Sequence, residues 1–193
     1  MRNAIRIVAL GMVAGLATTC QSDTDSDQAT GGATTGSGGA AQSGGSAPAD
    51  YVNAHNAVRA AVVVPANYPA GQPWVPLPDV TWSDSIAATA QAWAEQLASS
   101  GCTLEHATGT GYGENLAMGT RLTAQGAVDM WAEEASRYTY SPEYQFTDAG
   151  HYTQIVWRAT TQIGCGSAAC SGNSVIVCCR YSPPGNVIGQ QPY

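Results

Sequence analysis

Apolar residues recur with helical spacing in three stretches of the chain. The first follows Asp50, which is placed to cap a helix; the second runs from Ser83 to about Ser100, and the third from about Thr123 to Arg137. Apolar side chains at i, i+3, i+4 and i+7 share one face of a helix, so each stretch predicts an amphipathic helix. The expected buried stripes are Tyr51, His55, Val58 and Val62 in the first, Ile86, Ala90, Trp93 and Leu97 in the second, and Ala124, Val128, Trp131 and Ala135 in the third.

The first predicted helix carries a histidine on its inward face. His55 lies one turn before Arg59, and we interpret it as a packed, hydrogen-bonded side chain rather than a ligand. The next segment, from Pro65 to Pro78, is rich in proline, which disfavours helix and most strand pairing. We expect a surface loop there, held by the aromatic side chains of Tyr68 and Trp74.

The C-terminal part of the chain has the pattern of strands. Two extended runs, Gln162 to Ala169 and Ser174 to Tyr181, flank the turn sequence Ser171-Gly172-Asn173, which predicts an antiparallel hairpin. The second run is continuously apolar from Val175 to Cys179, as expected of a strand covered on both faces. Helices followed by such strands predict an α+β fold: an α-β-α three-layer sandwich with a small central antiparallel sheet.

The N-terminus has the pattern of an export signal. Arg2 and Arg6 precede an apolar run from Ile7 to Ala17, which is too short to span a bilayer as a stable helix. Leu16-Ala17-Thr18-Thr19-Cys20 resembles a bacterial lipobox, which would make Cys20 the lipidated N-terminal residue of the exported protein. The alternative is ordinary cleavage near Ala17, with Cys20 having no role. We therefore assign residues 1–19 to a signal peptide.

The segment after the signal differs sharply in composition from the rest of the chain. Residues 20–48 contain three aspartates and a Gly/Ser/Thr/Ala tract, with no aromatic and no large aliphatic side chain. Such a segment buries too little apolar surface to offset its ordering entropy, which predicts a flexible linker. The folded domain is expected to cover residues 49–193.

The charge balance excludes several classes of function. The net charge is −7, and removal of Arg2 and Arg6 leaves five arginines against 14 acidic residues, a net charge of −9. An acidic chain is a poor match for nucleic acid, and membrane association is expected only through an N-terminal lipid anchor. The sequence contains no lysine, which excludes a Walker-type phosphate loop and Schiff-base chemistry.

The cysteines are consistent with an exported, disulfide-bonded domain. Setting Cys20 aside leaves five of the six, an odd number. Cys178 and Cys179 are neighbours on a predicted strand and point to opposite faces, so Cys170 can staple the hairpin through only one of them. The predicted pairs are Cys102–Cys165 and Cys170–Cys179, with Cys178 left as a small buried thiol.

Four polar residues are candidates for a common site. His151 stands at the start of the amphipathic run G-H-Y-T-Q-I-V-W-R, His106 ends C-T-L-E-H, and Glu114 lies in G-E-N-L-A. Glu134 shares a helix face with apolar residues beside the core, where a carboxylate needs a partner. Its neighbour Glu133 falls on the solvated face, one turn from Arg137. We expect His106, Glu114, Glu134 and His151 to converge on one cleft.

Four motifs of this chain, in the same order, resemble those of the CAP superfamily, which groups cysteine-rich secretory proteins, antigen 5 and plant pathogenesis-related protein 1. They are H-N-A-V-R from His55, G-E-N-L-A, G-H-Y-T-Q-I-V-W-R, and C-R-Y-S-P-P-G-N-V-I-G-Q-Q-P-Y at the C-terminus. The resemblance covers about residues 49–193 and implies an α-β-α sandwich. Plant members are especially similar, although the cysteine pair that they carry before G-H-Y-T-Q is missing here.

The resemblance also implies a site. Matched motif by motif, the cleft histidines and glutamates of the family fall on His106, Glu114, Glu134 and His151. In some members the two histidines bind zinc or another divalent cation, and some members bind sterols or fatty acids at separate sites. Plant members can release a C-terminal signalling peptide resembling residues 183–193, but in this chain we interpret that segment as structural.

Two hypotheses for function follow. The first is a non-catalytic extracellular or cell-surface binding domain whose cleft holds a divalent metal, Zn²⁺ or another cation, or a small ligand. The resemblance implies a lipid or sterol as a further kind of partner. The metal ligands would be His106 and His151, with Glu114 and Glu134 orienting them or holding water. The alternative is a metal-dependent hydrolase, in which bound water attacks and a glutamate serves as base. H-E-x-x-H and G-x-S-x-G signatures are missing from the sequence.

Overall fold

The computed structural model describes residues 46–141, 143 and 148–193. The predicted signal peptide, Cys20 and nearly all of the predicted linker lie outside the described residues. No helix within the described ranges is both long and apolar enough to cross a membrane. The helices are α1 (Pro48–Ala60), α2 (Asp84–Ser99), α3 (Ala124–Ala132) and α4 (Gly150–Ile155), the 3₁₀ turns are η1 (Glu133–Arg137) and η2 (Ser171–Asn173), and the strands are β1 (Thr81–Trp82), β2 (Gly113–Thr120), β3 (Gln162–Ala169) and β4 (Ser174–Ser182).

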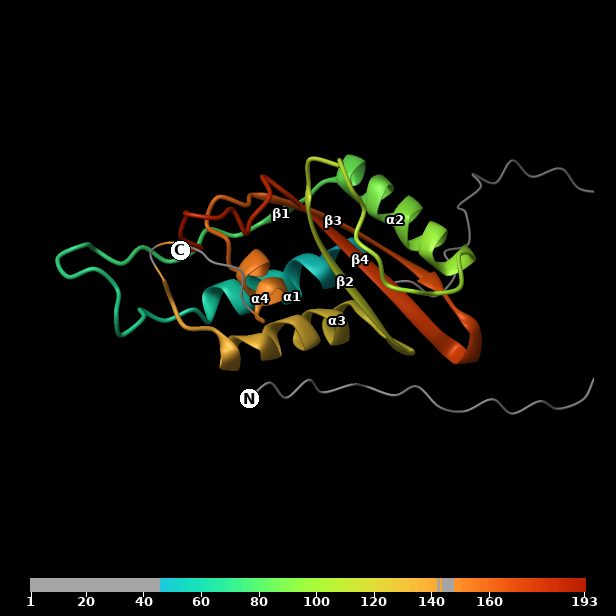
Figure 1. The fold of residues 1–193 in the computed structure, drawn as a ribbon, viewed down its shortest axis with the longest axis horizontal. Helices are drawn as coiled ribbons and strands as arrows, with labels where there is room; N and C mark the ends of the chain where they lie inside the picture. The colour runs from blue at the N-terminus through green and yellow to red at the C-terminus, as the bar shows by residue number, and fades with distance from the viewer. Residues whose placement is uncertain (1–45, 142, 144–147) are drawn as a thin grey trace, which may run out of the picture. The chain divides into compact units, whose positions relative to one another are not determined.

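The described residues form the predicted three-layer sandwich. Helix α2 packs on one face of the sheet, and α1, α3 and α4 lie on the other (Figure 1). The sheet has the order β1-β3-β4-β2. The predicted hairpin is confirmed as β3 and β4, and the predicted antiparallel sheet holds except for the two-residue strand β1, which runs parallel to β3.

Strand β2 was not predicted from the sequence. Its residues, G-E-N-L-A-M-G-T, include glycines and no β-branched residue before the final threonine, so local propensity does not favour a strand. It becomes one by pairing antiparallel with β4 along its whole length, from Gly113 opposite Tyr181 to Thr120 opposite Ser174. The strand lies at one edge of the sheet and bears Glu114.

Helix α2 approaches the sheet unusually closely. Ser83 caps the helix as predicted. Of the predicted stripe, Ile86, Ala90 and Leu97 are buried, whereas Trp93 is only half-buried. A Cβ atom added at Gly164 in β3 would collide with the backbone of Ile86 and Ala87 in α2. Gly166, two residues further along the same face, is equally close to the backbone of Gln91. The α2 layer therefore requires glycine at these two positions.

The third predicted helix changes geometry before its end. Helix α3 stops at Ala132 and continues as the 3₁₀ turn η1, so Ala135 is exposed rather than buried as expected. In a 3₁₀ turn the side chains at i and i+3 eclipse. Arg137 therefore pairs with Glu134, with 3.5 Å between Nη2 and Oε1, and not with Glu133 as α-helical spacing predicts.

The inner face of α1 carries two buried polar side chains. His55 is 1 % exposed; its Nδ1 lies 2.7 Å from the carbonyl oxygen of Tyr51 and its Nε2 lies 2.9 Å from the Tyr181 hydroxyl. The prediction of a packed, hydrogen-bonded histidine is confirmed. Arg59, also 1 % exposed, donates at 2.8 Å to the carbonyl oxygen of Ile155, the last residue of α4, and at 2.9 Å to that of Trp157.

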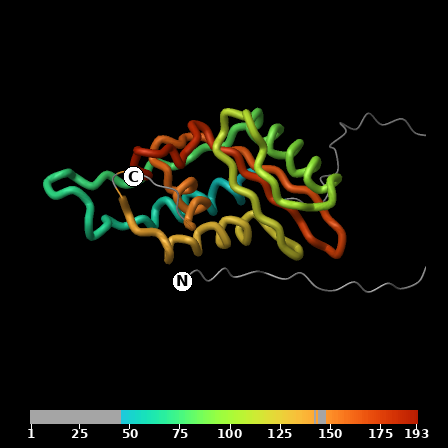
Figure 2. Tube along the Cα trace, viewed as in Figure 1, coloured from blue at the N-terminus to red at the C-terminus, as the bar shows by residue number. Residues whose placement is uncertain are grey.

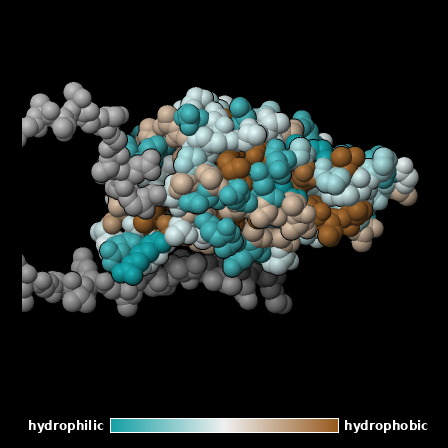
Figure 3. Space-filling view, turned by 180° about the vertical axis from the view of Figure 1, so that it is seen from behind, coloured by the Kyte–Doolittle hydropathy of each residue, from teal (hydrophilic) through white to brown (hydrophobic). Residues whose placement is uncertain are grey.

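The proline-rich connection between α1 and β1 is held by aromatic contacts, as predicted. The rings of Tyr68 and Trp74 meet edge to face at 5.3 Å between centroids, and Trp74 meets Tyr193 in the same way at 5.8 Å. The C-terminal segment thus runs back beside this connection (Figure 2). Viewed from behind, apolar side chains show at this end of the domain (Figure 3); Val63, Val64 and Val75 are exposed there.

The two disulfides of the described residues differ from the predicted pairs. Cys165 bonds Cys179, and Cys102 bonds Cys170. The prediction placed Cys170 opposite Cys179, but the β3–β4 register puts Cys165 there, with 4.1 Å between the two Cα atoms. Cys170 lies beyond the end of β3, beside the C-terminal end of α2, where Cys102 follows the helix. Cys178 is the free, buried cysteine of this part of the chain, as predicted.

The close approach of α2 predicts that Gly164→Ala destabilises the domain by roughly 1–3 kcal/mol, because the helix must move to admit the methyl group. Gly119→Ala in β2 is the matched control, since its added Cβ lies 3.6 Å from Leu122 Cδ1, an ordinary contact. Urea unfolding of the two variants checks this. Equal losses in both would show that the α2–β3 contact does not set the requirement for glycine.

Burial lowers the pKa of His55 from 6.5 to about 4. The unfolded chain then binds more protons than the native protein between these values, so stability falls as pH drops from about 6.5 through 4. At about 1.4 kcal/mol per pH unit, the loss of unfolding free energy reaches about 3 kcal/mol. His55→Gln keeps one donor and one acceptor but cannot titrate, so its unfolding free energy should fall less between pH 7 and 4. Identical pH slopes in variant and parent would contradict the assignment.

Candidate functional site

The first half of the site is a histidine–glutamate pair at the edge of the sheet. Glu114 projects from β2, and its Oε1 lies 2.9 Å from Nδ1 of His106, in the segment that follows α2. The same oxygen accepts the backbone N–H of Ala107 at 3.1 Å. Its other oxygen accepts from Arg180 Nε at 3.1 Å and contacts Cys178 Sγ at 3.9 Å. Arg180 is the residue directly opposite Glu114 on β4.

These contacts shift the acidity of both partners. The hydrogen bond with Glu114 raises the pKa of His106 above its ordinary value, against the opposing effect of partial burial. Burial alone would raise the pKa of Glu114, but the hydrogen bonds from His106, Ala107 and Arg180 outweigh it and leave that pKa lowered. Glu114 is therefore held as a carboxylate.

The second half is a matching pair on the other side of β2. Glu134 extends from η1, and its Oε1 lies 2.8 Å from His151 Nδ1 at the start of α4. Its Oε2 accepts two backbone N–H groups of that first turn, from His151 at 2.9 Å and Tyr152 at 3.2 Å. Arg137 also contacts Oε1, so each of the two Glu134 oxygens has two partners. One carboxylate thus caps the N-terminus of α4 and orients the histidine ring.

Two further side chains that support His151 were not singled out from the sequence. Asn115, next to Glu114 on β2, donates from Nδ2 to the carbonyl oxygen of His151 at 3.0 Å. The Trp131 ring stacks on the His151 ring, with 6.2 Å between centroids and 21° between planes. Asn115 stands beside Glu114 in G-E-N-L-A, but a role facing α4 becomes visible only once β2 is recognised as a strand.

The four predicted residues line one cleft. Its volume is about 330 Å³, and it is bordered by His106, Glu114, Asn115, Glu134, Asp148, Gly150, His151 and Asn186. A larger cavity of about 660 Å³ lies at the far end of β2, near Arg121 and the β3–β4 turn, and is lined by no histidine. The smaller cleft, in which the ionisable side chains converge, is the candidate site.

The donor set of the cleft bears on metal binding. In each histidine Nδ1 faces a carboxylate, so Nδ1 carries the proton and Nε2 keeps its lone pair, the arrangement found in carboxylate–histidine–zinc sites. Within residues 46–141, 143 and 148–193, no three His, Cys, Asp or Glu side chains are grouped so as to hold a metal ion. A cation bound to both imidazoles would therefore need its remaining ligands from outside the described side chains.

Comparison with known proteins gives the family. Residues 52–181 match the model of the CAP family, described as the cysteine-rich secretory protein family. Pathogenesis-related protein 1C of Nicotiana tabacum is 45 % identical over 148 residues, covering 75 % of this chain and 79 % of that protein. The PR-1-type pathogenesis-related protein of Sambucus nigra is 43 % identical over 152 residues, covering 76 % and 81 %.

Solved structures agree in fold. The crystal structure of NaASP2 with Zn²⁺ is 26 % identical with a TM-score of 0.61, covering 80 % of this chain and 90 % of that one. The venom allergen-like protein 4 of Schistosoma mansoni is 29 % identical with a TM-score of 0.56, covering 75 % and 91 %. The resemblance drawn from four sequence motifs is confirmed, and the chain belongs to the cysteine-rich secretory protein (CAP) family.

Proposed function

We propose that this protein is an exported, non-catalytic binding domain whose cleft holds a divalent cation, Zn²⁺ in the first place, through Nε2 of His106 and His151. The observation that carries the proposal is the paired arrangement of the two rings. Each imidazole gives its Nδ1 to a carboxylate and so presents Nε2 as a ligand, within the same cleft. The related protein NaASP2 has a crystal structure with Zn²⁺, which supports the same ion here.

The glutamates support binding over catalysis. A metal-dependent hydrolase needs a base that is free to take a proton from the attacking water. All four oxygens of Glu114 and Glu134 already accept or contact two partners each, and the pKa of Glu114 is lowered. Carboxylates committed in this way orient ligands well but accept protons poorly. The hydrolase alternative thus lacks an available base among the predicted residues.

Two imidazoles leave a tetrahedral zinc ion with two further positions to fill. Water or a donor atom of a small polar ligand would complete the coordination. A lipid or sterol, which the family resemblance implies at separate sites, is not part of this proposal, because the residues bordering the cleft are polar or glycine.

An extracellular location agrees with the chemistry of the chain. Disulfides persist in oxidising compartments, and Cys102–Cys170 and Cys165–Cys179 are both formed. The family description, secretory protein, points the same way. A lipid anchor at Cys20 stays a prediction, since that residue lies outside the described part of the chain.

Replacing both His106 and His151 with alanine should abolish zinc binding, because no other imidazole borders the cleft. Calorimetric titration of the purified domain with Zn²⁺ measures this. The domain should stay folded, since neither ring belongs to the buried core. Glu105→Gln, which removes an exposed charge beside His106, is the control and should bind as the parent does. Unchanged affinity in the double variant would leave a cleft that is only hydrogen-bonded.

Zinc affinity should also depend on pH in a defined direction. A proton on Nε2 competes with the metal, so affinity falls as pH drops through the pKa of His106, which Glu114 raises above 6.5. The decline should therefore begin on the alkaline side of 6.5, and Glu114→Gln should move its midpoint to lower pH. Zinc titrations between pH 8.5 and 5.5 would show this decline. An affinity that does not change across that range would contradict imidazole ligation.

A further inference from the structure

We infer that Asn115 is the positioning residue for His151: its buried amide locks the first turn of α4 to the sheet and so fixes where the His151 ring stands in the cleft. The expected effect on zinc affinity rests on the proposed function, whereas the position of the His151 ring does not. Asn115 is 1 % exposed and borders the cleft, and its amide nitrogen bonds the backbone carbonyl oxygen of His151 and the buried hydroxyl of Tyr181.

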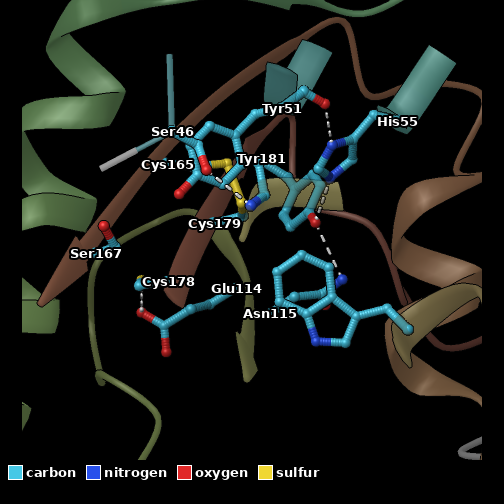
Figure 4. Close-up of a disulfide and its surroundings, with 12 residues drawn as sticks. Ser46, Tyr51, His55, Glu114, Asn115, Cys165, Ser167, Cys178, Cys179 and Tyr181 are labelled. Carbon is cyan, nitrogen blue, oxygen red and sulfur yellow. Dashed lines mark hydrogen bonds between the residues drawn. A yellow bond between two sulfur atoms is a disulfide. The ribbon is translucent and has the colours of Figure 1, made fainter. Parts of the chain in front are cut away.

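A buried chain of hydrogen bonds determines the orientation of this amide. His55 Nδ1 donates to the Tyr51 carbonyl oxygen, which leaves Nε2 as the acceptor for the Tyr181 hydroxyl. The Tyr181 oxygen in turn accepts from Asn115 Nδ2 at 3.0 Å. Burial keeps His55 neutral near pH 7, as this proton order requires. Figure 4 shows His55 beside Tyr51 and Tyr181, with Asn115 bonded to the Tyr181 hydroxyl.

The second hydrogen of the same amide group reaches α4. Asn115 Nδ2 donates to the carbonyl oxygen of His151 at 3.0 Å. A primary amide has two donors, and here one is used on Tyr181 and the other on His151. The backbone of His151 is therefore tied, through one side chain, to β4 and to the inward face of α1.

The next residue of β2 fixes the ring of His151 from another direction. The carbonyl oxygen of Leu116 accepts the indole N–H of Trp131 at 3.1 Å, and the Trp131 ring stacks on the imidazole. Asn115 thus holds the backbone of His151, Trp131 holds its ring face, and Glu134 holds Nδ1. Among the described residues, no hydrogen bond or ring pair joins His106 to Asn115 or Trp131, because its ring bonds Glu114 instead. The effect of Asn115 should therefore be confined to one histidine.

The experiment compares Asn115→Ala with Asn56→Ala. Asn56 is a matched control on α1, because its amide also bonds backbone: Nδ2 donates to the Val80 carbonyl oxygen at 3.1 Å and Oδ1 accepts the Val80 N–H at 2.8 Å. It does not border the cleft. The chain has three histidines, so their ring signals can be assigned by NMR. At pH 8.5, without metal, Asn115→Ala should shift the His151 ring protons out of the Trp131 ring current and leave those of His106 unchanged.

Zinc affinity gives the second measurement. Partners behind a metal ligand typically contribute tenfold to a hundredfold in affinity. Asn115→Ala should therefore weaken zinc binding by roughly tenfold or more, while Asn56→Ala, even if less stable, should bind as the parent does. Unchanged His151 signals in Asn115→Ala would overturn the inference. So would an equal loss of affinity in both variants, which would indicate a general effect of stability.

Two results separate this inference from the proposed function. If the parent binds no zinc, the proposed function fails, and the His151 signals of the metal-free protein alone decide the role of Asn115. If Asn115→Ala does not fold, Tyr181→Phe replaces it, because that variant keeps Asn115 but removes the hydroxyl that orients its amide. A smaller shift of the His151 ring signals is then expected, and no shift would refute the positioning role.

Discussion

The pairing of β2 with β4 is the constraint on which the cleft depends. Its register sets Glu114 opposite Arg180, and alternation along the strand turns Glu114 toward the α2 side and Asn115 toward the α1 and α3 side. Glu114 then meets His106 from one side of the sheet, and Asn115 meets His151 from the other. A shift of one residue would exchange these faces and separate Glu114 from His106 and Asn115 from His151. The site is therefore a property of one edge strand.

The two histidines are held to different degrees. The His106 side chain is 59 % exposed, and its segment is attached through the Cys102–Cys170 disulfide and a hydrogen bond from Trp93 to the Glu105 carbonyl oxygen. The His151 side chain is 35 % exposed and is restrained at its backbone, its ring face and Nδ1. A cation would thus meet one preorganised ligand and one that has more freedom to adjust. This asymmetry suits the binding of a small ion better than chemistry that needs two fixed groups.

The sequence was sufficient to predict the three layers, the hairpin, the aromatic contacts of the proline-rich connection and the free Cys178, because each has a local signal. It was also sufficient to select the four residues of the cleft, since each is a polar residue beside an apolar anchor. The sequence did not predict β2, whose pairing is imposed by β4. It also gave the wrong disulfides, because the β3–β4 register places Cys165 opposite Cys179. Asn115 and Trp131 were missed as site residues for the same reason: their partners are far away in the sequence and are set by tertiary contacts.

The short helix α4 shows why so many tertiary contacts are needed. Six residues are too few to form a stable helix alone. Glu134 caps its first turn, Asn186 donates to the Gly150 carbonyl oxygen at 2.8 Å, and the buried guanidinium of Arg59 binds carbonyl oxygens at the C-terminal end of the helix and just beyond it. Burial lowers the pKa of Arg59 only to about 10, so the group stays charged at neutral pH and its hydrogen bonds stay strong. The helix that carries His151 is therefore positioned by η1, α1 and the C-terminal segment together, and this fixes the place of its second residue, His151, beside the cleft.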